Sequence, residues 1–185
     1  MPFNFFNKNK KEEEEISYDP LNISVFDLQE GFVFEYDLRE WLVEEAYDYD
    51  WGSEHFTREY KVTDGTETYF LSVDGGDETE VALFKKIRLG EIDEDIASVI
   101  QKEEMPPQTI TFNKITFYRE NETPGFYRES GENSVWEELI SWDYYDEKEA
   151  FVIEIEQWGE RKYEAAFGKI LQEREISNIL AGKLS

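Results

Sequence analysis

Apolar and polar residues alternate along much of the chain, which is the pattern of a β-strand with one buried face. The clearest example spans residues 151–156. Phe151, Ile153 and Ile155 are expected to face inward, toward a core. The intervening Glu154 and Glu156 are expected to face outward, toward solvent.

The same alternation predicts further strands, each bounded by residues that favour turns. They span residues 32–36, 40–43, 55–62, 68–73, 80–85, 109–113, 114–119, 126–129 and 163–167. Asp64-Gly65 is a strong hairpin turn pair. At Glu91–Ile100 the apolar residues recur at helical spacing and predict a short helix. A second short helix is predicted at Glu173–Leu180, with Gly182 just past its end.

The two halves of the chain resemble each other. The segments 64–65, 70–73 and 84–87 recur as 146–147, 152–155 and 167–170, at an offset of 82 or 83 residues. Each copy is followed by a short Ile-rich segment. A repeat at a fixed offset indicates a duplicated unit, although amphipathic strands can also resemble one another by chance.

These patterns predict a mainly β fold with a minor α contribution. We expect two similar antiparallel β modules, each with a short closing helix. The predicted boundaries are a flexible tail over residues 1–18, a first module over 19–104 and a second over 105–185. A hinge is expected near Pro106-Pro107, because proline disfavours the helical conformation in the residue before it.

Aromatic and acidic runs that begin near residue 23 resemble an uncharacterised bacterial family. The runs are Leu28–Tyr36, Glu40-Trp41, Tyr49–Gly52, Glu59-Tyr60, Tyr69–Val73, Tyr144–Asp146, Ile153–Gly159 and Tyr163–Gly168. The family is catalogued only as a domain of unknown function, so the resemblance carries over no catalytic residue. It implies a gene context of membrane-stress proteins, small membrane proteins and polyamine metabolism.

The charge of the chain narrows the possible partners. It has 44 Asp and Glu residues against 19 Lys and Arg, a formal net charge of −25. Such a body should be repelled by DNA and RNA, whose affinity depends on phosphate contacts. The same field attracts cations, polyamines or basic protein surfaces. The chain has no cysteine, which excludes disulfides, thiolate metal sites and cysteine nucleophiles.

The segment between residues 47 and 54 is the candidate site for a cationic partner. Its aromatic and acidic residues interleave, which suits combined cation–π and carboxylate capture of an amine. The residues are Tyr47, Asp48, Tyr49, Asp50, Trp51 and Glu54. The alternative is that these aromatics belong to the core.

Other chemistry finds little support in the sequence. His55 is the sole histidine of the chain and is expected to be an ordinary exposed or hydrogen-bonded residue. A calcium-loop frame beginning at Asp48 fails, because Gly52 and Ser53 stand where an oxygen ligand and a glycine are required. With 44 acids, spacing alone cannot identify a catalytic carboxylate pair. No catalytic, cofactor-binding or metal-binding residue is therefore predicted.

The N-terminal stretch MPFNFFNKNKKEEEEI combines phenylalanines, lysines and glutamates. It lacks the charge-first, apolar-second order of a secretory signal. We expect a tail that docks weakly on a membrane surface or an apolar groove, or a chain end with no role. The contacting residues would be Phe3, Phe5, Phe6, Lys8, Lys10 and Lys11. The expected location is the bacterial cytoplasm, with peripheral contact at the inner membrane face if the tail binds.

The predicted function is a non-catalytic acidic binding or adaptor module for a cationic or membrane-associated partner, with a polyamine or a basic protein as the expected ligand. One alternative is an enzyme with a carboxylate-only site that acts on an amine or a glycan. Another is an acidic nucleic-acid mimic. A deep pocket that holds two carboxylates of raised pKa would favour the enzyme.

Overall fold

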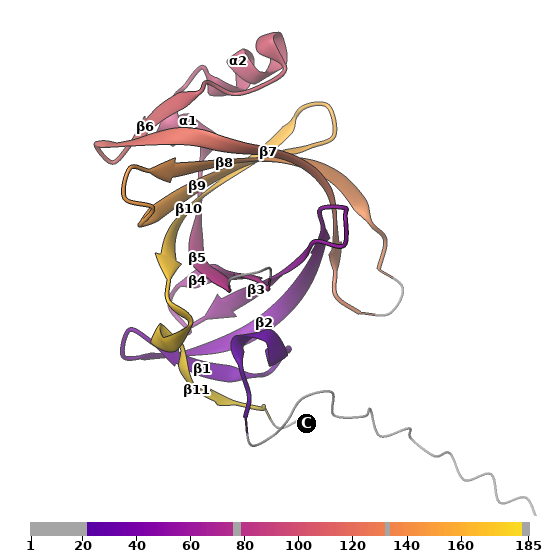
Figure 1. The fold of residues 1–185 in the computed structure, drawn as a ribbon, viewed down its shortest axis with the longest axis vertical. Coiled ribbons are helices and arrows are strands. Elements are labelled where there is room, and N and C mark those ends of the chain that lie inside the picture. The colour runs from indigo at the N-terminus through magenta and orange to yellow at the C-terminus, as the bar shows by residue number, and fades with distance from the viewer. Residues whose placement is uncertain (1–21, 76–78, 132–133, 183–185) are drawn as a thin grey trace, which may run out of the picture.

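The computed structural model describes residues 22–75, 79–131 and 134–182. In these residues the chain forms one antiparallel sheet of eleven strands and two short α-helices (Figure 1). The predicted mainly β fold is therefore confirmed. The proposed contact residues of the N-terminal tail lie outside the described residues.

The strands are β1 (Val33–Tyr36), β2 (Arg39–Asp50), β3 (Phe56–Thr63), β4 (Thr68–Asp74), β5 (Glu80–Ile87), β6 (Thr109–Phe112), β7 (Ile115–Glu129), β8 (Glu137–Asp146), β9 (Phe151–Trp158), β10 (Lys162–Leu171) and β11 (Ser177–Leu180). The helices are α1 (Leu89–Ile92) and α2 (Ile96–Glu103). Two 3-10 turns, η1 (Val25–Asp27) and η2 (Glu173–Glu175), flank the sheet.

The central strands close into a ring. The sheet order is β11-β1-β2-β3-β4-β5-β10-β9-β8-β7-β6, and β2 also pairs with β7. Within the described residues, eight strands from β2 through β10 and β9 to β7 therefore form a closed barrel. The remaining strands extend the sheet outside it, with β1 and β11 beside β2 and β6 beside β7.

Bulges in the two longest strands make this closure possible. The register shifts between Val43 and Glu45 in β2 and between Arg119 and Asn121 in β7. A bulge bends its strand and increases the local twist. Each strand can therefore pair with an outer strand over its first half and with the other long strand over its second half.

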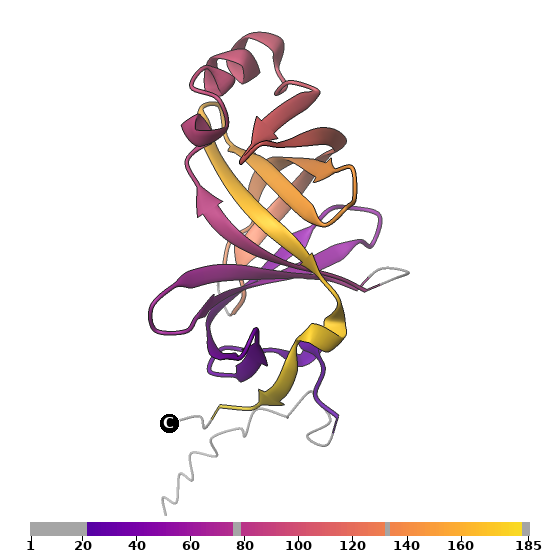
Figure 2. The ribbon, with the colours of Figure 1, turned by 90° about the vertical axis from the view of Figure 1, so that its left-hand side faces the viewer.

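The duplication predicted from the sequence appears in the topology. Strands β1 to β5 and strands β6 to β10 follow the same order of antiparallel neighbours. The first half lies below and the second half above in Figure 1. The two halves meet along β5 and β10, which run side by side in Figure 2. One sheet runs through both halves, and the domain boundaries given above stay predictions.

Two separate apolar cores lie on the outer side of the barrel strands. The first contains Val25, Leu28, Phe32, Phe34, Trp41, Val43, Ala46, Tyr60, Val62, Leu71, Val73, Val81, Leu83, Leu171 and Ile176. The second contains Ile96, Ile100, Ile110, Phe117, Trp142, Tyr144, Ile153, Ile155 and Ala165. Helix α2 and strand β6 cover the second core, as the top of Figure 1 shows. Successive side chains on a strand point to opposite faces. The residues that alternate with these apolar residues along each barrel strand therefore face the barrel interior.

The predicted closing helix at Glu173–Leu180 is wrong. Residues 173–175 form η2, and residues 177–180 form β11, which pairs with β1. Ile176 enters the first core. The other edge of β1 would otherwise expose unpaired backbone groups, and strand pairing satisfies them. The apolar spacing of this segment imitates a helical face, but the tertiary contact decides its conformation.

Three smaller expectations also need correction. The strands predicted at 114–119 and 126–129 are parts of the single strand β7. The helix predicted at Glu91–Ile100 is divided into α1 and α2 around residues 93–95. Strand β8 was not predicted.

Replacement of Gly168 by alanine should destabilise the seam between β5 and β10. A Cβ at this position would lie 2.6 Å from two ring carbons of Phe84 and 2.9 Å from Val152 Cγ1. We expect Gly168→Ala to lower the free energy of unfolding by about 1–3 kcal/mol, as overpacked cores do. Urea denaturation measures the change.

The control for this variant is Gly90→Ala in α1, where a Cβ meets open space. Alanine favours a helix over glycine by up to about 1 kcal/mol, so this variant should be neutral or slightly stabilised. Equal urea midpoints for the two variants would contradict the close packing at Gly168.

Candidate functional site

The interior of the barrel encloses a cavity of about 400 Å³. Its walls come from both halves of the chain, through strands β2, β3, β4, β5, β7, β8 and β9. An eight-stranded barrel is wide enough to hold one small ligand, and the volume lies within the range of small-molecule pockets. The cavity is therefore the candidate site.

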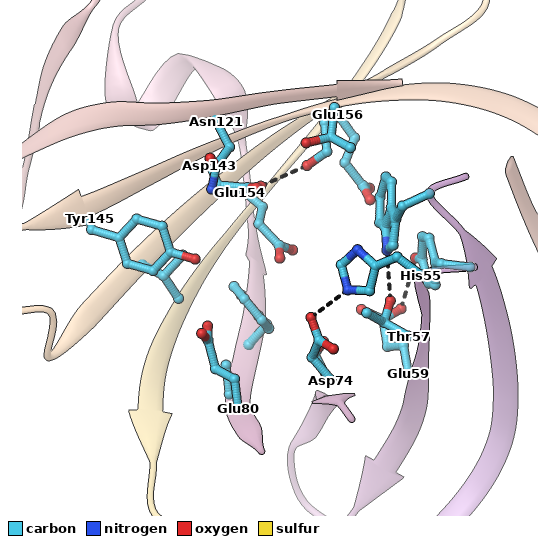
Figure 3. A pocket seen from close by; sticks show the side chains of 18 residues that line it. His55, Thr57, Glu59, Asp74, Glu80, Asn121, Asp143, Tyr145, Glu154 and Glu156 are labelled. Atoms are coloured by element: carbon cyan, nitrogen blue, oxygen red, sulfur yellow. Dashed lines mark hydrogen bonds and ion pairs between the residues drawn. The ribbon is translucent and has the colours of Figure 1, made fainter. Parts of the chain in front are cut away.

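Acidic and small polar side chains dominate the wall of the cavity (Figure 3). They are Thr57, Glu59, Ser72, Asp74, Glu80, Asn121, Thr123, Ser141, Asp143, Glu154 and Glu156. The expectation that Glu154 and Glu156 face solvent is wrong. Both faces of β9 are enclosed, because one packs in the second apolar core and the other faces the cavity.

At one end of the barrel, the partly exposed side chain of Lys86, 39% accessible, brings an ammonium group to the interior acids. The Nζ of Lys86 lies 3.1 Å from Glu164 and 3.7 Å from Glu156. It also lies 5.2 Å from the centre of the Phe70 ring. Burial opposes the charge of Lys86, but the carboxylates of Glu156, Glu59 and Glu164 outweigh it and raise the pKa of the lysine. We call Lys86, Glu59, Glu156 and Glu164 the lysine end.

Glu59 is a buried acid of the lysine end. The Tyr49 hydroxyl donates a hydrogen bond to its Oε1 at 3.3 Å. Burial raises the pKa of Glu59 to about 7, with the charge of Glu156 adding to the shift and that of Lys86 opposing it. Near neutral pH this side chain is therefore present in both protonation states.

A second acidic group lies across the cavity, and we call Glu80, Asp143 and Glu154 the open end. Glu80 is exposed, and Asp143 and Glu154 are partly buried. Burial raises the pKa of all three, and neighbouring carboxylates raise it further. Hydrogen bonds from Ser141, at 2.8 Å, and from Asn121 oppose the shift at Asp143. Among the described residues, no lysine or arginine forms an ion pair with any of the three.

Glu154 occupies the centre of this arrangement. Its carboxylate points into the middle of the space that the labelled side chains surround, between Tyr145 and His55 (Figure 3). Within the part of the chain that the structure describes, it accepts no hydrogen bond. The nearby charges of Asp143, Glu156 and Glu59 disfavour its ionised form, and only the charge of Lys86 favours it. Its carboxylate therefore lacks a close counterion.

His55 stands at the rim of the cavity. Its Nε2 lies 2.8 Å from Oδ2 of Asp74, and about half of its side chain is exposed. The sequence predicts an ordinary exposed or hydrogen-bonded histidine, and this contact agrees with that prediction. Its position among the cavity residues was not foreseen.

The residues predicted for cation capture are divided between two sides of the sheet. Tyr47, Tyr49 and Trp51 face the barrel interior, where Tyr49 and Trp51 stack with ring centres 5.4 Å apart. Asp48 lies on the opposite face, 3.1 Å from Arg128 and 3.4 Å from Arg58.

The other two predicted acids also lie away from the cavity wall. Asp50 accepts a hydrogen bond from the Gly52 amide at 2.9 Å, and Glu54 is exposed in the turn. The structure therefore places the aromatic half of the predicted site beside a different set of acids.

The acids of the cavity were missed because nothing local separates a buried interior face from a solvent-facing one. The best available signal lies in β8 and β9. There, acidic or small polar residues alternate with aromatic and β-branched residues that are fully buried.

Two further findings limit what the site and the chain can do. Among the described residues, no three His, Cys, Asp or Glu side chains converge closely enough to hold a metal ion. No helix in the described ranges has the length and apolar character needed to cross a bilayer.

The fold and the cavity together define a closed β-barrel with an acidic interior of ligand-binding size. Residues 29–173 match the family described as "Domain of unknown function (DUF4178)", and the chain belongs to this family. It is similar to an uncharacterized protein of Aquifex aeolicus (strain VF5), with 26% identity over 179 residues that cover 95% of this chain and 93% of that protein. No solved structure matches the chain.

The raised pKa of Glu59 predicts a pH-dependent stability difference. The folded protein keeps a proton on Glu59 up to about pH 7, whereas the unfolded chain loses it near the usual value of 4.5. The stabilisation that this proton gives the folded protein is fully present below the unfolded pKa of 4.5. It is lost as the pH rises through the folded pKa of about 7. Glu59→Gln keeps a neutral side chain and should be more stable than the parent protein above neutral pH.

Chemical denaturation at about pH 5.5 and about pH 8.5 tests this expectation. The advantage of Glu59→Gln should grow between the two conditions by about 2 kcal/mol, since one pKa unit corresponds to ~1.4 kcal/mol. Glu160→Gln, an exposed change in the β9–β10 turn, is the control and should show no such growth. Parallel pH profiles for the parent and Glu59→Gln would contradict the burial of an ionisable group at this position.

Proposed function

We propose that the barrel binds a small organic cation that carries an amine, and that it does so without catalysing a reaction. The observation that carries this proposal is the open end, where Glu80, Asp143 and Glu154 line the cavity and pair with no lysine or arginine of the described residues. Burial of a carboxylate is costly unless it is paired. A cation from solution would supply the missing partner.

The rest of the cavity wall suits an organic cation. Trp51 and Tyr145 contribute aromatic surface, and Phe84 and Val152 contribute apolar surface. Aromatic rings attract cations, and apolar surface accommodates methylene groups. The combination of carboxylates, rings and apolar wall fits an alkylammonium, and a short polyamine is the ligand of this class that we propose.

An enzyme with a carboxylate-only site is the second candidate. It is favoured by a specific observation, the raised pKa of both Asp143 and Glu154 within one cavity. Acids with raised pKa values serve as general acids and bases. The binding function is preferred because the same shifts follow from burial and mutual repulsion when no cation is present.

The acidic outer surface supports the predicted interaction with a basic protein segment only in a general way. The nucleic-acid mimic is less well supported by the cavity, because its acids lie inside the barrel. There they cannot present a phosphate-like stripe to a DNA-binding protein. The cavity therefore favours a small ligand over a macromolecular one.

Titration calorimetry with spermidine tests the proposal on the full chain. We expect saturable binding of one ligand per barrel, and at least a tenfold loss of affinity in Glu154→Gln. A tenfold loss corresponds to ~1.4 kcal/mol, less than the usual cost of breaking a buried charge pair. Glu160→Gln should bind as the parent protein does, because its position is exposed and outside the cavity wall.

The affinity should also rise with pH. Because the pKa of each open-end acid is raised, a larger fraction of it is protonated at a given pH than of an ordinary carboxyl group, and any such proton must leave before the carboxylate can pair with an ammonium group. Calorimetry in buffers of different ionisation enthalpy should therefore detect proton release on binding. Absence of binding at low salt, where charge attraction is strongest, would end the proposal. Conversion of the ligand, seen by mass spectrometry, would establish the enzyme instead.

A further inference from the structure

The internal repeat relates the two ends of the barrel interior position by position. In the first half, Val73 of β4 pairs with Val81 of β5, and both lie in the first apolar core. In the second half, Ile155 of β9 pairs with Ala165 of β10, and both lie in the second apolar core. These two pairs are equivalent in strand order, register and environment.

The acids next to these apolar pairs are also equivalent. Asp74 and Glu80 stand directly opposite each other on β4 and β5. Glu156 and Glu164 stand directly opposite each other on β9 and β10. The repeat has therefore placed a pair of facing carboxylates in each half. Like charges that face each other across strands destabilise a sheet unless another charge offsets them.

A lysine offsets these charges in one half only. Lys86, three residues after Leu83 on β5, binds both members of the Glu156–Glu164 pair. The equivalent residue of β10, three residues after Phe167, is Ile170. The pairings Leu71–Leu83 and Ile153–Phe167 fix this correspondence. It is shifted by one residue from the sequence match of 84–87 with 167–170, so Ile170 and not Lys169 is the structural equivalent of Lys86. The Glu156–Glu164 pair therefore has the ammonium group of Lys86 beside it. At the matching position of the Asp74–Glu80 pair stands the apolar side chain of Ile170.

The Asp74–Glu80 pair belongs to a larger acidic group than its counterpart. The charge of Glu80 acts on Asp143, and that of Asp143 acts on Glu154. Asp74 has a partner in His55 at 2.8 Å, but Glu80 and Glu154 form no ion pair with any described residue. The carboxylate of Glu154 points into the space above Glu80 and Asp74 in Figure 3.

We infer that the open end is a subsite for one primary ammonium group, which takes the place that Lys86 takes at the lysine end. This inference rests on the proposed function and narrows its ligand class. Lys86 shows what the arrangement accepts, which is a compact ammonium held between facing carboxylates and near a ring, here that of Phe70. Tyr145 supplies the ring and a hydroxyl at the open end.

A primary ammonium meets these requirements better than other cations. It carries three donors around a point charge, so it can bind several carboxylates that approach from different directions. A guanidinium group is planar and favours one carboxylate in a parallel geometry. A quaternary ammonium has no N–H donor. The expected order of affinity is therefore propylamine first, then guanidinium and tetramethylammonium.

The first experiment titrates the full chain with propylamine, guanidinium, tetramethylammonium and Ca²⁺ separately, followed by NMR chemical shifts. Propylamine should bind at least tenfold more tightly than the other three. Tighter binding of guanidinium or tetramethylammonium would overturn this inference and leave the proposed function standing. Preference for Ca²⁺, or no binding of any organic cation, would overturn the proposed function as well.

The second experiment installs the missing ammonium. Ile170→Lys should fill the open end from within and reduce propylamine affinity at least tenfold, while Ile170→Met, of similar length and no charge, should retain it. Thermal unfolding checks that both variants fold. If Ile170→Lys is folded and binds propylamine as the parent does, the equivalence with Lys86 is wrong. If Ile170→Lys does not fold, Glu80→Gln replaces it, with the same tenfold loss expected and unchanged affinity as the contradicting result.

Discussion

Closure of the sheet is the constraint on which the rest of the structure depends. Once β2 pairs with β7, each central strand of the barrel has one face turned to the interior and the other turned outward. The outer faces carry the large apolar residues, and the first and second apolar cores cover them. Alternation then sends the polar residues inward. The acidic cavity is thus a direct consequence of where the two cores lie.

This arrangement makes Lys86 the central counterion of the interior. Glu156 is buried, so its repulsion with the facing Glu164 is stronger than that between two fully exposed acids. Lys86 relieves that repulsion for Glu156 and Glu164. For the open end, relief comes from proton uptake, which the raised pKa values express, or from a bound cation. The apolar cores supply the stability that allows the interior to tolerate this cost.

The sequence predicted the positions of the strands better than it predicted which of their faces are buried. Period-two patterns located most strands, and the fixed offset indicated the duplication that the strand order confirms. The helix predicted over β11 was wrong because Ile176 packs in a core formed by distant segments. The side of β9 that carries Glu154 was misjudged for the same reason. Whether an alternating strand has one or two enclosed faces depends on long-range pairing, here of β2 with β7, and no local pattern encodes it.

Duplication explains both the symmetry of the barrel and the asymmetry of its interior. Two copies with the same strand order can close one ring, because each copy offers the other a long bulged strand and a final strand with a free edge. Each copy also brings a pair of facing acids to the interior. A lysine in both copies would neutralise the two pairs and leave a self-contained core. The exchange of lysine for isoleucine between Lys86 and Ile170 leaves Asp74 paired with His55 and Glu80 without a lysine among the described residues, and this difference makes the open end the candidate binding site.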